Sequence, residues 1–133
     1  MKGAYAMDVR QIRTSTETRG LIEKLRNTYI QERFKDEQVT MTPGYILNAA
    51  WEEVKNTEDW NTIINSVIKV DDEFSSKVKE TKTPVVRYSL STNTSDGLNK
   101  LTKKFSDELG LRVQTGFTAK QIIKAAILLR EEK

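Results

Sequence analysis

The side chains best suited to recognising a partner molecule stand in two short segments of the chain. Gln11 and Arg13 occupy alternate positions near the N-terminus, and Arg87 and Ser89 do so in the second half. These side chains form hydrogen bonds readily but have little catalytic chemistry of their own. The sequence contains no histidine and no cysteine, which removes the usual general base near neutral pH, the commonest zinc ligands and the Ser–His and Cys–His nucleophile pairs. We therefore expect a binding protein that is not an enzyme and needs no metal or other cofactor.

Both segments belong to an internal repeat. Residues 9–55 align with residues 85–131 without a gap, at an offset of 76, and 12 of the 47 aligned pairs are identical. The identities include a Ser-Thr-x-Thr run and a Thr-x-x-x-Ile-x-x-Ala-Ala run in each copy. Ungapped agreement in both polar turn residues and apolar spacing indicates a duplication.

Each copy predicts the order strand, helix, turn, helix. At the start of the second copy, Val86, Tyr88 and Leu90 alternate with polar residues, a period typical of a half-buried strand. A Ser/Thr-rich stretch that can cap a helix follows, and then come two apolar stripes at helical spacing. The expected first-helix stripes are Leu21, Ile22, Leu25, Tyr29 and Phe34, and Leu98, Leu101, Phe105 and Leu109. The expected second-helix stripes are Ile46, Leu47, Ala50, Trp51 and Val54, and Ile122, Ile123, Ala126, Ile127 and Leu129.

The second helix of each copy has its own start signal. Thr42 precedes a proline, which suits the first helical position because its missing N–H would have no partner there. Thr118 and Gln121 have the spacing of a capping box. Breaks near residues 36–38 and 110–116 separate these helices from the first ones.

One copy alone would not make a stable fold. It buries too little apolar surface, and its single strand would leave a row of backbone N–H and C=O groups unpaired. We therefore expect a mainly α protein with a small two-stranded antiparallel ribbon, in which the two strand-helix-helix repeats form one compact internal pseudo-dimer. Residues 1–8 would be an N-terminal arm, and residues 56–84 a connector with a helix near 57–69 that Thr57 caps.

The element order, with a Thr-opened second helix and its Ile-x-x-Ala-Ala stripe, resembles the ribbon-helix-helix family of DNA-binding proteins, with both halves of the usual dimer in one chain. In that family the ribbon enters the major groove of double-stranded DNA. The resemblance implies that the outward strand residues contact bases, namely Gln11, Arg13, Arg87 and Ser89. It also implies phosphate contacts at the N-terminus of each second helix, namely Thr42, Gly44, Thr118 and Lys120.

One departure from the repeat concerns the inward strand face. Copy one has Arg10 and Thr14 where copy two has the apolar Val86 and Leu90. Either Arg10 reaches around to a phosphate, or the first strand has a different register.

The leading hypothesis is a cytoplasmic, sequence-specific double-stranded DNA-binding protein. It would be a transcriptional repressor or, as in the similar TraY-type proteins, an accessory factor of plasmid transfer with a relaxase or another transfer protein as partner. We expect a monomer in solution that can assemble cooperatively on DNA. Because the two strands differ, its preferred site need not be palindromic. The net charge of +3 agrees with an anionic partner and arises mainly in copy two, which has eight basic and four acidic residues.

Two alternatives remain open. Residues 42–55 and 118–131 could be helix-turn-helix recognition helices that present Asn48, Glu52 and Lys124 to DNA. A helical interaction module, such as an adaptor that uses the connector helix or an antitoxin-like partner, would bind no nucleic acid. A membrane protein is a poor match, since no apolar run approaches the roughly 18 residues of a spanning helix.

Overall fold

A computed structural model describes residues 7–34, 39–69 and 85–131. Most of the predicted N-terminal arm, the turn predicted at 36–38 and the end of the connector at 70–84 lie outside the described residues. No helix within the described part is long and apolar enough to cross a membrane.

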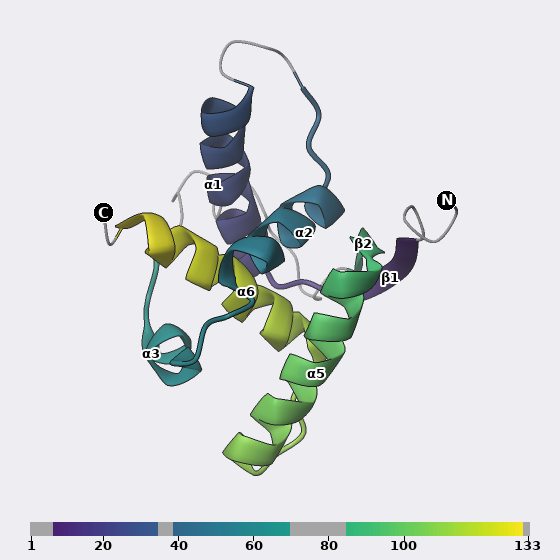
Figure 1. Cartoon of the computed structure of the whole chain (residues 1–133), viewed down its shortest axis with the longest axis vertical. Helices are drawn as coiled ribbons and strands as arrows, with labels where there is room; N and C mark the ends of the chain where they lie inside the picture. The colour runs from purple at the N-terminus through teal and green to yellow at the C-terminus, as the bar shows by residue number, and fades with distance from the viewer. Residues whose placement is uncertain (1–6, 35–38, 70–84, 132–133) are drawn as a thin grey trace.

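Two strand-helix-helix units make up the fold (Figure 1). The elements are β1 (Met7–Arg13), α1 (Thr16–Arg33) and α2 (Pro43–Val54) in the first unit, α3 (Trp60–Asn65) in the connector, and β2 (Val85–Ser91), α5 (Thr92–Leu109) and α6 (Thr115–Glu131) in the second unit. The two strands pair antiparallel at one side of the molecule, and α2 and α6 cross at its centre between α1 and α5 (Figure 1). The prediction of a mainly helical fold with a two-stranded antiparallel ribbon is confirmed.

The strand register agrees with the sequence repeat. Gln11 lies opposite Arg87, and these two residues are 76 positions apart, which is the offset of the repeat. Each of them is therefore paired with its own counterpart, and a pseudo-two-fold axis passes between them. Helices α1 and α5 also begin and end at equivalent positions of the two copies.

Equivalent serines cap the first helix of each unit. Ser15 Oγ accepts a hydrogen bond from the N–H of Thr18 at 3.1 Å, and Ser91 Oγ accepts one from the N–H of Thr94 at 3.2 Å. Each cap satisfies a backbone donor that has no partner inside its helix and contributes about 1 kcal/mol to stability. The predicted capping role of the Ser/Thr-rich stretches is confirmed.

The core lies between the ribbon and the four long helices, and both units contribute to it. Its large, fully buried side chains are Leu21, Leu25, Tyr29, Ile46, Leu47, Tyr88, Leu90, Leu98, Phe105, Ile122 and Ile123. Trp60 of α3 joins them, with its ring in edge-to-face contact with Phe105 at 5.7 Å between centroids. Two residues of the predicted stripes, Leu109 and Leu129, are 42% and 40% exposed, and Phe34 and Trp51 are half-buried. Leu109 and Leu129 lie near the C-terminal ends of their helices.

A charged network ties α6 to the first unit. Arg130 donates hydrogen bonds to both carboxylate oxygens of Glu53, at 2.8 and 2.7 Å, and to Glu32 at 2.9 Å. The Tyr29 hydroxyl also donates to Glu53, at 2.9 Å. Burial alone would raise the pKa of Glu53, but the hydrogen bonds from Arg130 and Tyr29, with the charges of Arg130 and Arg33, lower it overall. The network therefore needs the ionised carboxylate.

The start of α6 differs from the prediction. The helix begins at Thr115, so Thr118 lies inside it and is not its cap. The hydroxyls of Thr118 and Thr102 share a hydrogen bond of 2.7 Å, which joins α6 to α5. The Thr118 side chain thus satisfies a contact between helices instead of a helix end.

The connector helix is shorter than predicted. Helix α3 spans Trp60–Asn65, where a helix near 57–69 was expected. Asp59 caps it in place of Thr57, because its carboxylate accepts a hydrogen bond from the N–H of Thr62 at 3.2 Å. A carboxylate suits this position since it also interacts favourably with the positive end of the helix dipole.

Candidate nucleic-acid interface

The outer ribbon face consists of the strand residues that point away from the helices. They are Met7, Val9, Gln11 and Arg13 on β1, and Val85, Arg87 and Ser89 on β2, and all of them are exposed. The four residues predicted to contact bases therefore share one face, as the strand alternation predicts. Val9 and Val85, which are equivalent in the repeat, keep 47% and 50% of their surface exposed.

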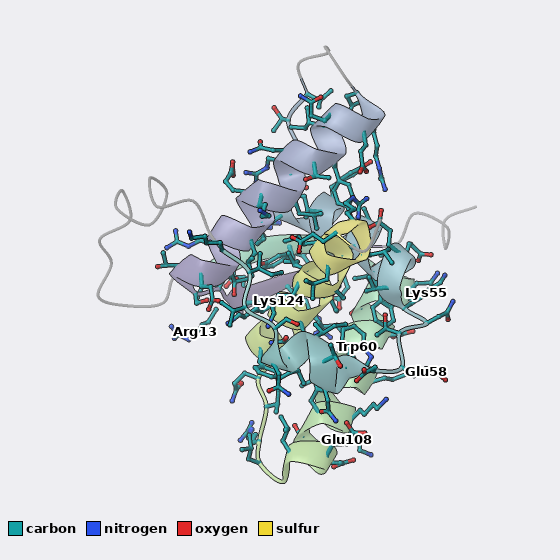
Figure 2. The ribbon with its side chains drawn as sticks, turned by 90° about the vertical axis from the view of Figure 1, so that its left-hand side faces the viewer. Arg13, Lys55, Glu58, Trp60, Glu108 and Lys124 are labelled. Atoms are coloured by element: carbon teal, nitrogen blue, oxygen red, sulfur yellow. The ribbon has the colours of Figure 1, made fainter. Side chains whose placement is uncertain are left out.

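The centre of the outer ribbon face is the Gln11–Arg87 pair. The cross-strand pairs on this face are Met7–Ser91, Val9–Ser89, Gln11–Arg87 and Arg13–Val85. Its two charged residues, Arg13 and Arg87, are both basic, so the face has no carboxylate to repel an anionic partner. Figure 2 shows the Arg13 side chain projecting away from the body of the molecule.

The inner ribbon face holds the strands on the helices. Ile12, Tyr88 and Leu90 are buried, and so is Thr14, which takes the place of Leu90 in copy one. Thr14 donates a hydrogen bond to the Ile12 carbonyl at 3.0 Å and lies 2.9 Å from the Tyr88 hydroxyl. A pair of hydrogen bonds thus replaces an apolar contact, and the predicted register of the first strand holds.

Arg10 also lies on the inner side of β1 and is paired within the chain. It donates to Asn99 Oδ1 at 2.6 Å and to Asp8 Oδ2 at 3.1 Å. Ser95 donates to the same Asp8 oxygen at 2.5 Å, and the hydrogen bonds from Ser95 and Arg10 lower the pKa of Asp8. These contacts tie β1 to α5 of the other unit. A phosphate contact by Arg10 stays a prediction, and in the structure its side chain has a positioning role.

The N-terminus of α2 lies directly against the ribbon. Thr42 caps this helix as predicted, and its exposed hydroxyl accepts a backbone hydrogen bond at 3.2 Å. Gly44 approaches β2 so closely that a Cβ at this position would lie 2.6 Å from the carbonyl oxygen of Ser89. Asn48 donates to the Ser89 carbonyl at 3.3 Å and accepts from the Ser91 N–H at 3.0 Å. These contacts fix the start of α2 beside β2.

The start of α6 takes the corresponding place beside β1. A Cβ on Gly116 would overlap the carbonyl oxygen of Arg13. Arg13 is the counterpart of Ser89 in the repeat, whereas Gly116 is not the counterpart of Gly44. Two different glycines therefore permit the same close approach, and the N-termini of α2 and α6 flank the ribbon at pseudo-symmetric positions.

The first turn of α6 removes two predicted phosphate contacts from the helix N-terminus. Thr118 is fully buried, so in this structure its side chain offers no surface to a phosphate. Lys120 lies further along α6 and is ion-paired with Glu17 of α1 at 2.6 Å. The residues at the actual start of the helix are Thr115 and Gly116.

The residues predicted to read DNA from helix-turn-helix units have other contacts. Asn48 holds β2, as described above. Lys124 is 4% exposed and donates to the Ile64 carbonyl at 3.2 Å, between α6 and α3 (Figure 2). Burial lowers the pKa of Lys124. Glu52 is exposed and ion-paired with Lys55 at 2.7 Å. These contacts leave the helix-turn-helix alternative without two of its three reading residues.

The place of Met7 on the outer ribbon face and the contact of Asn48 with β2 were not predicted. Met7 extends the outer ribbon face because β1 begins two residues before Val9. Its signal was present, since Met7 continues the alternation of Val9, Gln11 and Arg13. The link from Asn48 to β2 has no local sequence signal, because its partner strand lies in the other repeat.

Comparisons with protein-family models, with curated proteins and with solved structures gave no match. The arrangement of strands and helices can nevertheless be compared with a known type of fold. It consists of two strand-helix-helix units whose strands pair antiparallel, which is consistent with a tandem ribbon-helix-helix fold. Such a fold is compatible with DNA binding through the ribbon.

Proposed function

We propose that the chain is a sequence-specific double-stranded DNA-binding protein whose outer ribbon face enters the major groove. The observation that supports this proposal best is the exposed Gln11–Arg87 pair, which lies at the centre of a face without carboxylates and between two helix N-termini. The major groove, about 12 Å wide, admits a two-stranded ribbon. The face therefore has the shape, the charge and the hydrogen-bonding groups that base recognition needs.

Each polar residue of the outer ribbon face has a role in this proposal. The Arg87 guanidinium donates two hydrogen bonds to O6 and N7 of a guanine, and the Gln11 amide pairs with N6 and N7 of an adenine. Arg13 and Ser89 contact bases on either side of the centre. Val9 and the equivalent valine of β2 pack against thymine methyl groups. Because the two strands present different residues, the two halves of the preferred site differ in sequence.

Phosphate contacts come from the two helix N-termini that flank the ribbon. At α2 the resemblance implied Thr42 and Gly44, and we assign the contact to the exposed Thr42, because Gly44 is buried against β2. At α6 we assign the contact to the backbone N–H groups of Thr115 and Gly116, because these begin the helix. The positive end of each helix dipole favours a phosphate at this place.

The cellular role in this proposal is occupancy of a DNA site. The protein would repress transcription by excluding the polymerase, or it would help a relaxase to assemble at a plasmid transfer origin. A footprint on the DNA around its own gene decides between these roles. Protection of a promoter supports repression, and protection confined to a transfer origin supports the accessory role.

Duplex binding and its salt dependence test the proposal. Sites are first selected from a random duplex pool, and the affinity for the best site is then measured at several salt concentrations. We expect the affinity to fall steeply as salt rises, because phosphate neutralisation releases counterions. Arg87→Ala should weaken binding to the selected site by about 1–3 kcal/mol, since it removes a bidentate base contact.

Arg112→Ala is the matched control for this substitution. Arg112 is exposed in the turn after α5, whose C-terminal end lies away from the ribbon (Figure 1). Its replacement removes the same charge from the chain but should leave sequence preference unchanged. Equal losses in the two variants, or the absence of salt-dependent duplex binding, would contradict the proposal and favour a protein-interaction module.

A further inference from the structure

A groove opens between α3 and the C-terminal parts of α2 and α6. Its volume is about 460 Å³, within the range of about 300–1,000 Å³ that is usual for binding pockets. Its apolar lining residues are Val54, Ile63, Ala125, Leu128 and Leu129. Helix α3 and the C-terminal end of α6 lie on the side of the molecule opposite the ribbon (Figure 1). A partner in this groove would therefore not compete with a molecule bound to the outer ribbon face.

The charged residues that line the groove are all acidic. They are Glu53, Asp59 and Glu131, in a chain whose net charge is +3. Glu53 forms an ion pair with Arg130. The Asp59 carboxylate caps the start of α3 by accepting a hydrogen bond from the Thr62 N–H. Glu131 is exposed and has no ion-pair partner among the described residues. The groove thus combines an apolar lining with negative charge at its edge, on a protein that is otherwise basic.

Leu129 shows that residues 7–34, 39–69 and 85–131, which the structure describes, do not fill this groove. It is 40% exposed, although it belongs to the predicted apolar stripe of α6. Ala125, one turn earlier on the same helix, is buried but too small to occupy the space beside it. An incoming apolar side chain would therefore find an apolar wall on α6 and another on α3, from Ile63.

The groove also breaks the pseudo-symmetry of the fold. One of its walls is α3, which belongs to the connector and to neither repeat. In the part of the chain that the structure describes, the other unit has no equivalent of this helix. A partner bound here would occupy a defined side of the molecule.

We propose that this groove binds a basic amphipathic segment of a partner protein. An apolar side chain of the segment enters the cavity beside Leu129, and flanking lysine or arginine side chains pair with Asp59 and Glu131. Recognition of an amphipathic segment by an apolar groove needs few anchor residues, and complementary charge sets its orientation. The proposal does not depend on DNA binding, since it involves neither the ribbon nor the helix N-termini beside it.

A random 15-residue peptide library displayed on phage, selected on the full chain, tests this inference. The library is first passed over the Leu129→Ser variant, so that peptides that bind outside the groove are removed. We expect enriched peptides to carry apolar residues three or four positions apart, flanked by lysine or arginine. A synthetic peptide with the enriched sequence is then titrated by fluorescence anisotropy. Leu129→Ser and Glu131→Lys should each weaken its binding about tenfold or more.

Two exposed residues outside the groove provide matched controls. Leu111→Ser, just after α5, matches Leu129→Ser, and Glu108→Lys, within α5, matches Glu131→Lys. Both controls should leave peptide affinity unchanged. Duplex affinity should be retained in Leu129→Ser, which keeps this test separate from that of DNA binding. The inference is overturned if no peptide is enriched, if the enriched peptides have acidic or neutral flanks, or if the control variants weaken binding equally.

Discussion

Arg87 and Gln11 face each other across the ribbon and are counterparts in the repeat, yet they offer different hydrogen bonds. Arginine has a planar fork of donors, whereas glutamine has one donor group and one acceptor. Strand alternation alone was enough to predict that both point outward. It was not enough to predict the surroundings of Arg10, because its partner Asn99 lies in the other repeat and far away in the sequence.

Arg87→Lys separates base recognition from simple charge attraction. Lysine keeps the positive charge but lacks the planar fork, so it loses the bidentate geometry on guanine. We expect the salt dependence of duplex binding to stay the same, while discrimination against the wrong central base falls by about 1–2 kcal/mol. Competition between the selected duplex and single-base variants measures this. Unchanged discrimination would mean that Arg87 contacts only phosphate.

Glu53 makes the stability of the fold sensitive to acid. Its pKa in the folded chain lies below the ordinary value of 4.5, so its contribution is complete above that pH and is lost as the pH falls through the folded pKa. Glutamine cannot ionise, so Glu53→Gln should reduce the free energy of unfolding at neutral pH by about 1–3 kcal/mol. It should also show a shallower decline toward low pH in urea titrations. Glu108→Gln, on the exposed face of α5, should follow the wild-type profile, and the same profile for Glu53→Gln would contradict the role of the network.

At the scale of elements, the repeat and its apolar spacing predicted the strands and the long helices, whereas local signals misplaced some of their ends. The capping-box pattern at Thr118 is real in the sequence, but α6 begins earlier because Gly116 can pack against β1. That contact joins residues about a hundred positions apart, so no local pattern announces it. The start of α3 was mispredicted for a local reason. Thr57 and Asp59 are both suitable caps and lie two residues apart, and the helix begins after Asp59.

The close approach of α2 to β2 depends on Gly44. An alanine Cβ at this position would overlap the backbone of Ser89, which cannot move without shifting the ribbon. Gly44→Ala should therefore lower the free energy of unfolding by about 3 kcal/mol and weaken duplex binding as well. Gly110→Ala is the control, because Gly110 has φ 70° and a Cβ added there would meet no atom within 4 Å. It should cost only about 1 kcal/mol and leave duplex binding intact. Urea midpoints of the two variants compare them directly, and equal losses would argue against the close packing.

The whole molecule is a pseudo-dimer whose two halves have diverged. The sequence repeat predicted its architecture, because a single strand-helix-helix unit needs a second one to pair its strand and cover its core. The predicted site residues of the strands gathered on one face for the same reason. The groove beside α3 was not predicted, since it depends on how a non-repeated helix packs across α6. Two identical strands would require a palindromic DNA site. The difference between the two strands is therefore what makes the proposed DNA recognition testable.

Exchanging residues between the strands tests the central claim most directly. The double variant Gln11→Arg with Arg13→Ser gives β1 the polar outward residues of β2, and Val9 already matches its counterpart in β2. Both substituted positions, Gln11 and Arg13, are exposed, so the fold should tolerate the change. Duplex sites are then selected from one random pool with the wild-type chain and with the double variant. We predict a non-palindromic consensus for the wild type and an inverted repeat for the variant. The same consensus for both chains, or no consensus for the wild type, would contradict recognition of DNA by the outer ribbon face.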